Sequence, residues 1–312
     1  MNLGDLSDFQ PGEAARSAVL RLSSAFARRW AASIALDANP WVTLHKELDA
    51  WRDQKRVARF WWRDDDAVEP TEPLSRLLDT RSALGIPLAL AVIPERAQHS
   101  LRNRLSGAGG ITVLQHGWCH ANHARPGAPD SEFPAHRTRE DVAREIRQGH
   151  LRLEEMFGGL FAPVFVPPFN HVANKWIATL ADAGLRCVST IGDFYAPRIA
   201  CKNVHLDVID WKTKEARPPV QIVRSAVASL RMRRLGLIPS DSPIGVLTHH
   251  LDHTESVWHL TLELFKQLID HPAASFPHLT EVLSDEHQAR SPIAPIRLVA
   301  LHSVGASGHK PQ

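Results

Sequence analysis

Cysteine is scarce in this sequence, and the few that occur form no pattern. Only Cys119, Cys187 and Cys201 are present among 312 residues. No two of them make a C-x-x-C pair, and an odd number cannot complete a disulfide framework. A disulfide scaffold is therefore not expected, and nothing points to an oxidising compartment.

Long apolar runs are missing too, and so is an excess of charge of one sign. No stretch approaches the roughly 18 consecutive apolar residues that indicate a membrane span. The first residues lack a basic region followed by an apolar core, so we expect no signal peptide and predict a cytoplasmic location. The 36 basic and 34 acidic residues nearly balance, which gives no support for a nucleic-acid or membrane-surface partner. The oligomeric state is left open.

Patterning along the chain predicts three parts. Residues 1–55 are predicted to be a helical extension packed on the main domain, with helices over 14–36 and 41–54. Residues 56–290 alternate between strand and helix patterns, which is typical of a parallel α/β domain. Residues 291–312 are predicted to be an irregular tail.

The alternation also predicts the fold class. Strands separated by helices favour an α/β fold, a distorted or incomplete (β/α)7 barrel. Active sites of parallel barrels lie at the carboxyl ends of the strands. Strands are expected over 57–63, 86–93, 111–115, 164–166, 187–190, 204–209 and 244–248, and helices over 73–84, 96–105, 138–157, 173–183, 219–235 and 255–269.

Two polar segments follow apolar runs and therefore lie at expected strand ends. His116-Gly117-Trp118-Cys119-His120 places two imidazoles four residues apart, and Asp64-Asp65-Asp66 places three carboxylates side by side. A carboxylate with two histidines is the ligand set of a catalytic divalent metal that keeps an open position for water. Alone, each segment is more often surface histidines or a solvated turn, but together they favour a metal site. Cys119 is expected to be a small buried thiol and not a ligand.

Five strand-end segments together resemble the motifs of the polysaccharide deacetylase family, also called carbohydrate esterase family 4 or NodB-like. Arg63-Asp64-Asp65-Asp66-Ala67 is similar to that family's T-F-D-D-G, and the histidine segment to H-[ST]-x-x-H with glycine in the hydroxyl position. Val166-Pro167-Pro168-Phe169-Asn170 corresponds to R-x-P-[YW]-G. Asp207-Val208-Ile209-Asp210-Trp211 keeps D-x-x-D-W, and Leu247-Thr248-His249 keeps L-x-H. The five occur in the family's order and imply its distorted barrel.

The resemblance implies a catalytic role for five residues. Asp66, His116 and His120 would bind zinc or a similar divalent ion, which would lower the pKa of a bound water and polarise an amide carbonyl. Asp65 would be the general base that takes the proton of this water. His249 would be the general acid that protonates the departing amine.

Supporting residues follow from the same resemblance. Asp210 would orient His249 and hold it charged. The walls of an acetyl pocket and other substrate contacts are expected from Phe169, Pro168, Trp211, Leu247 and Asn122.

Departures from the motifs leave alternatives open. The arginine that steadies the base in the family is Val166 here, and Arg63 or a later arginine is the candidate replacement. The aspartate run can also shift by one position. Asp65 as base and Asp66 as ligand is favoured, with Asp64 as base and Asp65 as ligand the alternative.

The predicted activity is removal of N-acetyl groups from an N-acetylated saccharide. The alternatives are a hydrolase of another C–N or ester bond on the same scaffold and a glycan-binding pseudoenzyme. His250 and His253 are alternative acids or metal ligands. A solvated basic face is expected on the helix over 219–235, made by Arg224, Arg231, Arg233 and Arg234.

Overall fold

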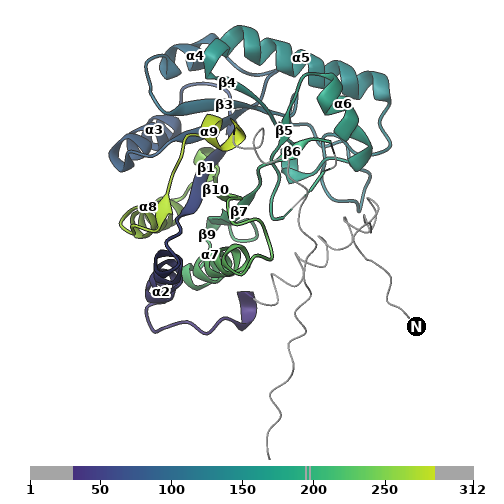
Figure 1. Cartoon of the computed structure of the whole chain (residues 1–312). Helices are drawn as coiled ribbons and strands as arrows, with labels where there is room; N and C mark the ends of the chain where they lie inside the picture. The colour runs from purple at the N-terminus through teal and green to yellow at the C-terminus, as the bar shows by residue number, and fades with distance from the viewer. Residues whose placement is uncertain (1–30, 194, 197, 285–312) are drawn as a thin grey trace, which may run out of the picture.

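The computed structural model describes residues 31–284 except 194 and 197, and within them eight parallel strands curl around a common interior (Figure 1). Neighbouring strands follow the order β6-β5-β4-β3-β2-β1-β10-β7, with β11 added beside the start of β1. β8 (Ile209–Asp210) and β9 (Glu215–Ala216) form a separate antiparallel hairpin. The sheet strands are β1 Ala58–Ala67, β2 Leu88–Val92, β3 Ile111–His116, β4 Phe161–Val166, β5 Cys187–Val188, β6 Ala200–Cys201, β7 Val204–Asp207, β10 Ile244–Thr248 and β11 Ala274–Ser275.

The curled sheet comes close to closing on itself. Beyond β5, Ile191 forms a parallel bridge with Val204 of β7. The amide of Val204 also donates to the carbonyl oxygen of Thr190 at 2.9 Å. A short contact thus joins β7 to the segment that follows β5, where a complete barrel would have a full ladder. The predicted distorted (β/α) barrel is confirmed.

Helices cover the outside of the sheet (Figure 1), and their ends follow local signals in the sequence. Thr71 begins α3 by accepting a hydrogen bond from the amide of Leu74 at 3.1 Å, and Gly85 ends it in the left-handed region at φ 66°. The α-helices are α2 Pro40–Asp53, α3 Glu72–Leu84, α4 His99–Leu105, α5 Arg139–Phe157, α6 Ile177–Asp182, α7 Pro219–Arg234, α8 Glu255–Ile269 and α9 Leu279–Ser284.

Alternate side chains of β1 face opposite sides of the sheet, which decides which of them can reach a site inside the barrel. Trp61 packs in the interior cluster, whereas Phe60 and Trp62 pack in the larger cluster beneath the helices. Leu279 and Val282 of α9 join the interior cluster, and α9 lies over the ring of strands in Figure 1. The amino end of the barrel is filled in this way, which leaves the carboxyl ends of the strands for a site.

The helix α2 packs on the barrel through α7 (Figure 1). Glu47 of α2 is only 3% exposed, and its carboxylate accepts hydrogen bonds from Arg231 at 2.7 Å and from Arg234 at 2.6 Å. Arg224 donates to a backbone carbonyl just before α2, and Arg233 is itself buried. The predicted solvated basic face is therefore wrong. A buried carboxylate needs charged or hydrogen-bonding partners, and the arginines of α7 supply them.

Several short elements have no counterpart in the sequence pattern, namely β6, the β8–β9 hairpin, β11 and α9. Each spans two to six residues, which is too short for a periodic signal. The predicted helix over 14–36 and the tail over 291–312 fall mainly or wholly outside the described residues. No helix between residues 31 and 284 is long and apolar enough to cross a membrane.

Candidate metal centre and active site

Asp66 is aimed at the site by an irregularity at the end of β1. Regular alternation would place its side chain on the same outer face as that of Asp64. The pairing of β1 with β2 shifts register between Asp64 and Ala67, and Asp66 has φ 74°, in the left-handed region. Such a backbone conformation costs about 1–3 kcal/mol in a residue other than glycine and is found preferentially at functional sites.

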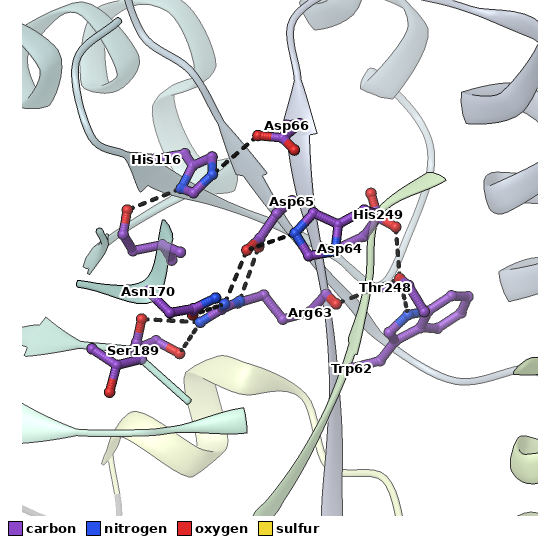
Figure 2. Close-up of polar contacts among 12 residues, drawn as sticks. Trp62, Arg63, Asp64, Asp65, Asp66, His116, Asn170, Ser189, Thr248 and His249 are labelled. Carbon is purple, nitrogen blue, oxygen red and sulfur yellow. Dashed lines mark hydrogen bonds and ion pairs between the residues drawn. The ribbon is translucent and has the colours of Figure 1, made fainter. Parts of the chain in front are cut away.

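His116, the last residue of β3, points at Asp66 (Figure 2). Its Nδ1 lies 3.0 Å from the carbonyl oxygen of Val166, so this nitrogen carries a hydrogen and donates it. Its Nε2 lies 3.1 Å from Oδ1 of Asp66. Two acceptors therefore face one imidazole, which requires either a second proton on the ring or a cation between Nε2 and the carboxylate.

His120 approaches the same carboxylate oxygen from the loop after β3. Its Nε2 lies 3.3 Å from Oδ1 of Asp66, and its ring lies 4.9 Å from that of His116. The ligand atoms of these three residues all lie within 4.8 Å of one another, and no other group of this kind is found in the described part of the chain. The three predicted metal ligands are thus brought together.

Charges in this cluster favour a cation. Burial opposes ionisation of Asp66, but His116, His249 and His120 hold its pKa well below the ordinary value. Burial also opposes charge on His116, yet the carboxylates of Asp65 and Asp66 raise its pKa. The pKa of His120 is lowered by burial and by His116. These surroundings favour the ionised form of Asp66, the uncharged form of His120 and a second proton on His116, which a bound metal would displace.

The three residues fit a divalent metal. Oδ1 of Asp66 is buried and has no hydrogen-bond partner among the described residues, although two imidazole nitrogens face it. Two nitrogens and one carboxylate oxygen match the catalytic sites that keep an open coordination position. The carbonyl of Val166 fixes the tautomer of His116, as outer partners of metal-binding histidines usually do.

Asp65 lies on the inner face of β1 and is held by Arg63 (Figure 2). Its Oδ2 accepts a hydrogen bond from Nη2 of Arg63 at 2.9 Å, and its Oδ1 lies 2.9 Å from Nε. Arg63 and Asp65 are 0% and 1% exposed. The guanidinium also donates to Oγ of Ser189 at 2.8 Å and to Oδ1 of Asn170 at 2.7 Å. Arg63 therefore supplies the charge that is missing at Val166.

Asp64 faces the outer side of the sheet and has separate partners. It accepts hydrogen bonds from Oγ1 of Thr248 at 2.6 Å and from the amide of His250 at 3.0 Å. Its Oδ1 lies 2.5 Å from Nδ1 of His250. The shifted register with Asp64 as base does not fit this geometry, and His250 is not available as an acid. His253 packs against Trp258 of α8.

His249 follows β10 and faces Asp65. Its Nε2 lies 3.8 Å from Oδ2 of that carboxylate. The edge of its ring meets Trp211 with centroids 4.7 Å apart. Nε1 of Trp211 donates to Oδ2 of Asp207 at 2.8 Å. The predicted base and acid thus lie together beside the metal cluster, with Trp211 as one wall.

Asp210 does not orient His249, contrary to the sequence-based prediction. Its carboxylate accepts a hydrogen bond from the amide of Lys212 at 3.1 Å, inside the β8–β9 turn. Nδ1 of His249 is buried and has no hydrogen-bond partner in the part of the chain that the structure describes. The prediction is wrong because the turn directs the carboxylate to its own backbone.

The predicted pocket residues differ in what they offer a substrate. Phe169 and Trp211 are 38% and 39% exposed, and the ring of Phe169 lies 4.7 Å from that of His120. Leu247 has no exposed surface and packs in the barrel interior, so it cannot contact a substrate as predicted. Pro168 is buried beside the histidine loop, which gives it a structural role and not the predicted substrate contact.

Asn122, a predicted substrate contact, is exposed and has hydrogen-bond partners within its own loop. Its Nδ2 donates to Asp130 at 2.6 Å. Its Oδ1 accepts hydrogen bonds from the amides of Ala124 and Ser131. The side chain shapes the loop after the second histidine, and its polar atoms are occupied there.

Cys119 is a protonated thiol and not a metal ligand. Its Sγ donates to Oε1 of Glu132 at 3.2 Å, and burial together with the Glu132 charge raises its pKa to about 11. Glu132 is wholly buried and has no place in any of the five motifs. Its loop lacks a periodic pattern, so nothing in the sequence marks it.

Neither a protein-family model nor a curated protein matches this sequence. The fold is similar to that of a "putative polysaccharide deacetylase" from Mycobacterium smegmatis, with a TM-score of 0.54, 14% identity, and coverage of 78% of this chain and 94% of that one. A family 4 carbohydrate esterase from Streptomyces lividans, in complex with acetate, matches at a TM-score of 0.45 and 16% identity over 70% of this chain and 90% of that one. A family 4 acetyl xylan esterase from Clostridium thermocellum, in complex with a cobalt ion, matches at a TM-score of 0.46 and 15% identity over 73% of this chain and 92% of that one. The first likeness shows that this chain has the polysaccharide-deacetylase fold.

Proposed function

We propose that this chain is a metal-dependent hydrolase that removes N-acetyl groups from an N-acetylated saccharide. The observation that carries the proposal is the convergence of Asp66, His116 and His120 beside the carboxylate of Asp65, at the carboxyl end of a parallel barrel. The fold likeness supports the scaffold, and the site chemistry supports the activity.

The residues at the metal cluster hold and orient the ion. Asp66, His116 and His120 would be its ligands, with zinc the best match to one carboxylate and two imidazoles. A divalent ion held there supplies a bound water of lowered pKa and polarises the carbonyl of the acetyl group. The bulge at Asp66 and the carbonyl of Val166 set the directions of the ligands in advance.

Asp65 is the proposed general base, and His249 the proposed general acid. Arg63 faces both oxygens of Asp65, so the carboxylate keeps one orientation toward a water at the cluster. Nε2 of His249 lies 3.8 Å from this carboxylate and would give its proton to the departing amine. The products would be acetate and a free amino sugar.

A saccharide suits the surface around the site. Two partly exposed aromatic rings, Phe169 and Trp211, flank it, and aromatic faces pack well on the apolar faces of sugar rings. A cavity of about 1060 Å³ is lined in part by His171, Tyr195 and Asp207, the last of which accepts the hydrogen bond from Trp211. Such a volume is at the upper end for small-molecule pockets and leaves room for more than one sugar unit.

The proposal is tested by metal analysis together with acetate release from N-acetyl-chitooligosaccharides. We expect about one divalent ion per chain and activity that His116→Ala abolishes together with the metal. Asp65→Asn should abolish acetate release and keep the metal. Asp130→Asn, a matched change on the exposed loop, should behave as wild type. Absence of a stoichiometric ion, with His116→Ala indistinguishable from wild type, would refute the proposal, whereas metal binding without turnover would favour the pseudoenzyme.

A further inference from the structure

We propose that Glu132 is a positioning residue that fixes the metal ligand His120 through the backbone of the loop between the two histidines. The inference rests on the metal site of the proposed function and is independent of the reaction performed there. It adds to that site a side chain that lies twelve residues beyond His120 in the chain.

Three consecutive backbone amides converge on the Glu132 carboxylate. Oε2 accepts a hydrogen bond from the amide of Trp118 at 3.1 Å. Oε1 accepts from the amides of Cys119 at 2.8 Å and His120 at 3.2 Å, and from the Cys119 thiol. Successive amides that point at one anion form a backbone nest, and hydrogen bonds to an ionised acceptor are stronger than neutral ones. The carboxylate therefore defines the path of this loop.

Glu132 is itself held from the opposite side. Its neighbour Phe133 forms a parallel bridge with Val172, and Oγ of Ser131 donates to the carbonyl of His171 at 3.0 Å. Glu132 is 0% exposed, and a buried carboxylate is unfavourable unless it is hydrogen-bonded. The side chain therefore links the segment after β4 with the loop that carries His120.

Gly117 shows that the loop is built around this carboxylate. A Cβ placed at position 117 would lie 2.0 Å from Oε2 of Glu132 and 2.5 Å from Cγ of Pro168. Gly117 also has φ 59°, which favours glycine. The space that a side chain would need at this position is occupied by Glu132.

The contact matters for the metal because His120 has a strained backbone. Its φ is 62°, in the left-handed region, which costs about 1–2 kcal/mol for a residue with a side chain. The hydrogen bond from its amide to Glu132 stabilises that conformation, which aims Nε2 at Asp66. Without the carboxylate, we expect His120 to relax toward negative φ and its Nε2 to leave the cluster.

The test is a titration of metal-free protein with Co²⁺, followed by visible absorption, for wild type, Glu132→Gln and Glu132→Asp. Outer partners of metal ligands typically change affinity by about 10–100-fold, and we expect a loss in this range for Glu132→Gln. Its cobalt spectrum at saturation should also differ, because one ligand is misplaced. Glu132→Asp keeps the charge but is one methylene shorter, so an intermediate loss is expected. Asp130→Asn, the control from the same loop, should match wild type.

The outcomes separate this inference from the proposed function. If wild type binds no Co²⁺, the metal site and the role of Glu132 both fail. If wild type binds and the two Glu132 variants have the same Kd and spectrum, the inference is overturned and the metal site stands. A lowered unfolding temperature with unchanged Kd and spectrum would show a purely structural role and also overturn it. Failure of both variants to fold would do the same, because the carboxylate is proposed to act on the site and not on the fold.

Discussion

Two regions of the site depart from expectation in opposite directions. At the end of β4 the third motif has lost its arginine to Val166, yet Asp65 still receives a guanidinium, from Arg63. In the segment Asp207–Trp211 the fourth motif is intact, yet Asp210 makes none of the contact expected with His249. A catalytic carboxylate needs a positive charge beside it, and an arginine on any strand or loop that reaches that position can supply this charge. Intact motif letters fix which groups are present and not where they point.

The difference follows from the rigidity of the two supporting elements. β1 is a central strand, paired along its length with β10 and β2, so the inward direction of Arg63 is fixed by the pleat. The hairpin of β8 and β9 has only two residues in each strand. Backbone amides in such a tight turn compete for a nearby carboxylate, and the carboxylate of Asp210 accepts its hydrogen bond from the amide of Lys212.

Removal of Arg63 should have the largest effect. Arg63→Met leaves Asp65 as a buried carboxylate without its partner, and breaking a buried ion pair on one side costs about 3–5 kcal/mol of unfolding free energy. Acetate release should be lost. Arg63→Lys keeps the positive charge but not the planar guanidinium, so its stability and activity should lie between those of wild type and Arg63→Met. Denaturant unfolding with a parallel activity assay measures both effects.

Two further variants show whether the loss comes from the unpaired charge. The double change Arg63→Met with Asp65→Leu should recover most of the stability and none of the activity, since no charge is left buried. Arg76→Met, which removes an exposed partner of Glu255, should change the unfolding free energy by less than about 1 kcal/mol. If Arg63→Met were as stable as wild type, Arg63 would not be the residue that compensates for the missing arginine at Val166.

The outer face of β1 gives the next largest effect, through Asp64 and His250. Burial opposes charge on both groups, but their mutual attraction lowers the pKa of Asp64 and raises that of His250. A raised histidine pKa gives stability that is present below the unfolded value of about 6.5 and is lost as pH rises through the folded value. A lowered aspartate pKa gives stability that is present above about 3.8 and is lost as pH falls.

The measurement is the unfolding free energy of the metal-free protein against pH. We expect wild type to exceed His250→Gln most near about pH 6 and to exceed it progressively less toward about pH 9, as the native histidine loses its proton. A gap that stays constant or widens over this range would contradict a charged His250. It would also weaken the view that the pleat of β1 separates the roles of neighbouring aspartates.

Much of the fold could be predicted from local signals. β10 over Ile244–Thr248 and α8 over Glu255–Ile269 have the predicted bounds, because an unbroken apolar run and a strongly periodic helix leave little choice. The placement of His116 after an apolar run likewise predicted its position at a strand end. These features depend on residues that are close in the chain.

The rest depends on contacts that the chain makes with itself at a distance. The bulge at Asp66 is marked by no glycine, since Ala67 follows it, and tertiary contacts impose its positive φ. Glu132 lies in a loop without periodicity, where burial cannot be predicted. The polar face of α7 was predictable, but its partner Glu47 lies more than 180 residues away in the sequence. A motif therefore does not encode the direction in which a side chain points or the distant residue that it contacts.

A smaller effect is expected at Asp207, the motif aspartate that does support the site. Asp207→Asn keeps one acceptor for the amide of Ile209 but turns a second donor toward Nε1 of Trp211. We expect a loss of about 1–2 kcal/mol in stability and a several-fold rise in KM as Trp211 loosens, with kcat less affected. Steady-state kinetics on N-acetyl-chitooligosaccharides would show this split, and an unchanged KM would argue that Trp211 is not a wall of the pocket.

The smallest effect is expected at Asp210, where the motif is intact and the geometry is not. Asp210→Asn retains an oxygen that can accept from the amide of Lys212 and removes no contact with His249. Stability should stay within about 0.5 kcal/mol of wild type and activity within about twofold. The decisive measurement is the pH dependence of kcat, which reports the ionisation of the general acid in the substrate complex. If Asp210 acts on His249 in the substrate complex, Asp210→Asn will lower the pKa of the acid and shift the alkaline limb to lower pH. An unshifted limb would show that the fourth motif, although intact, no longer orients His249. The third motif, by contrast, has lost its arginine, but the charge beside Asp65 is kept through Arg63.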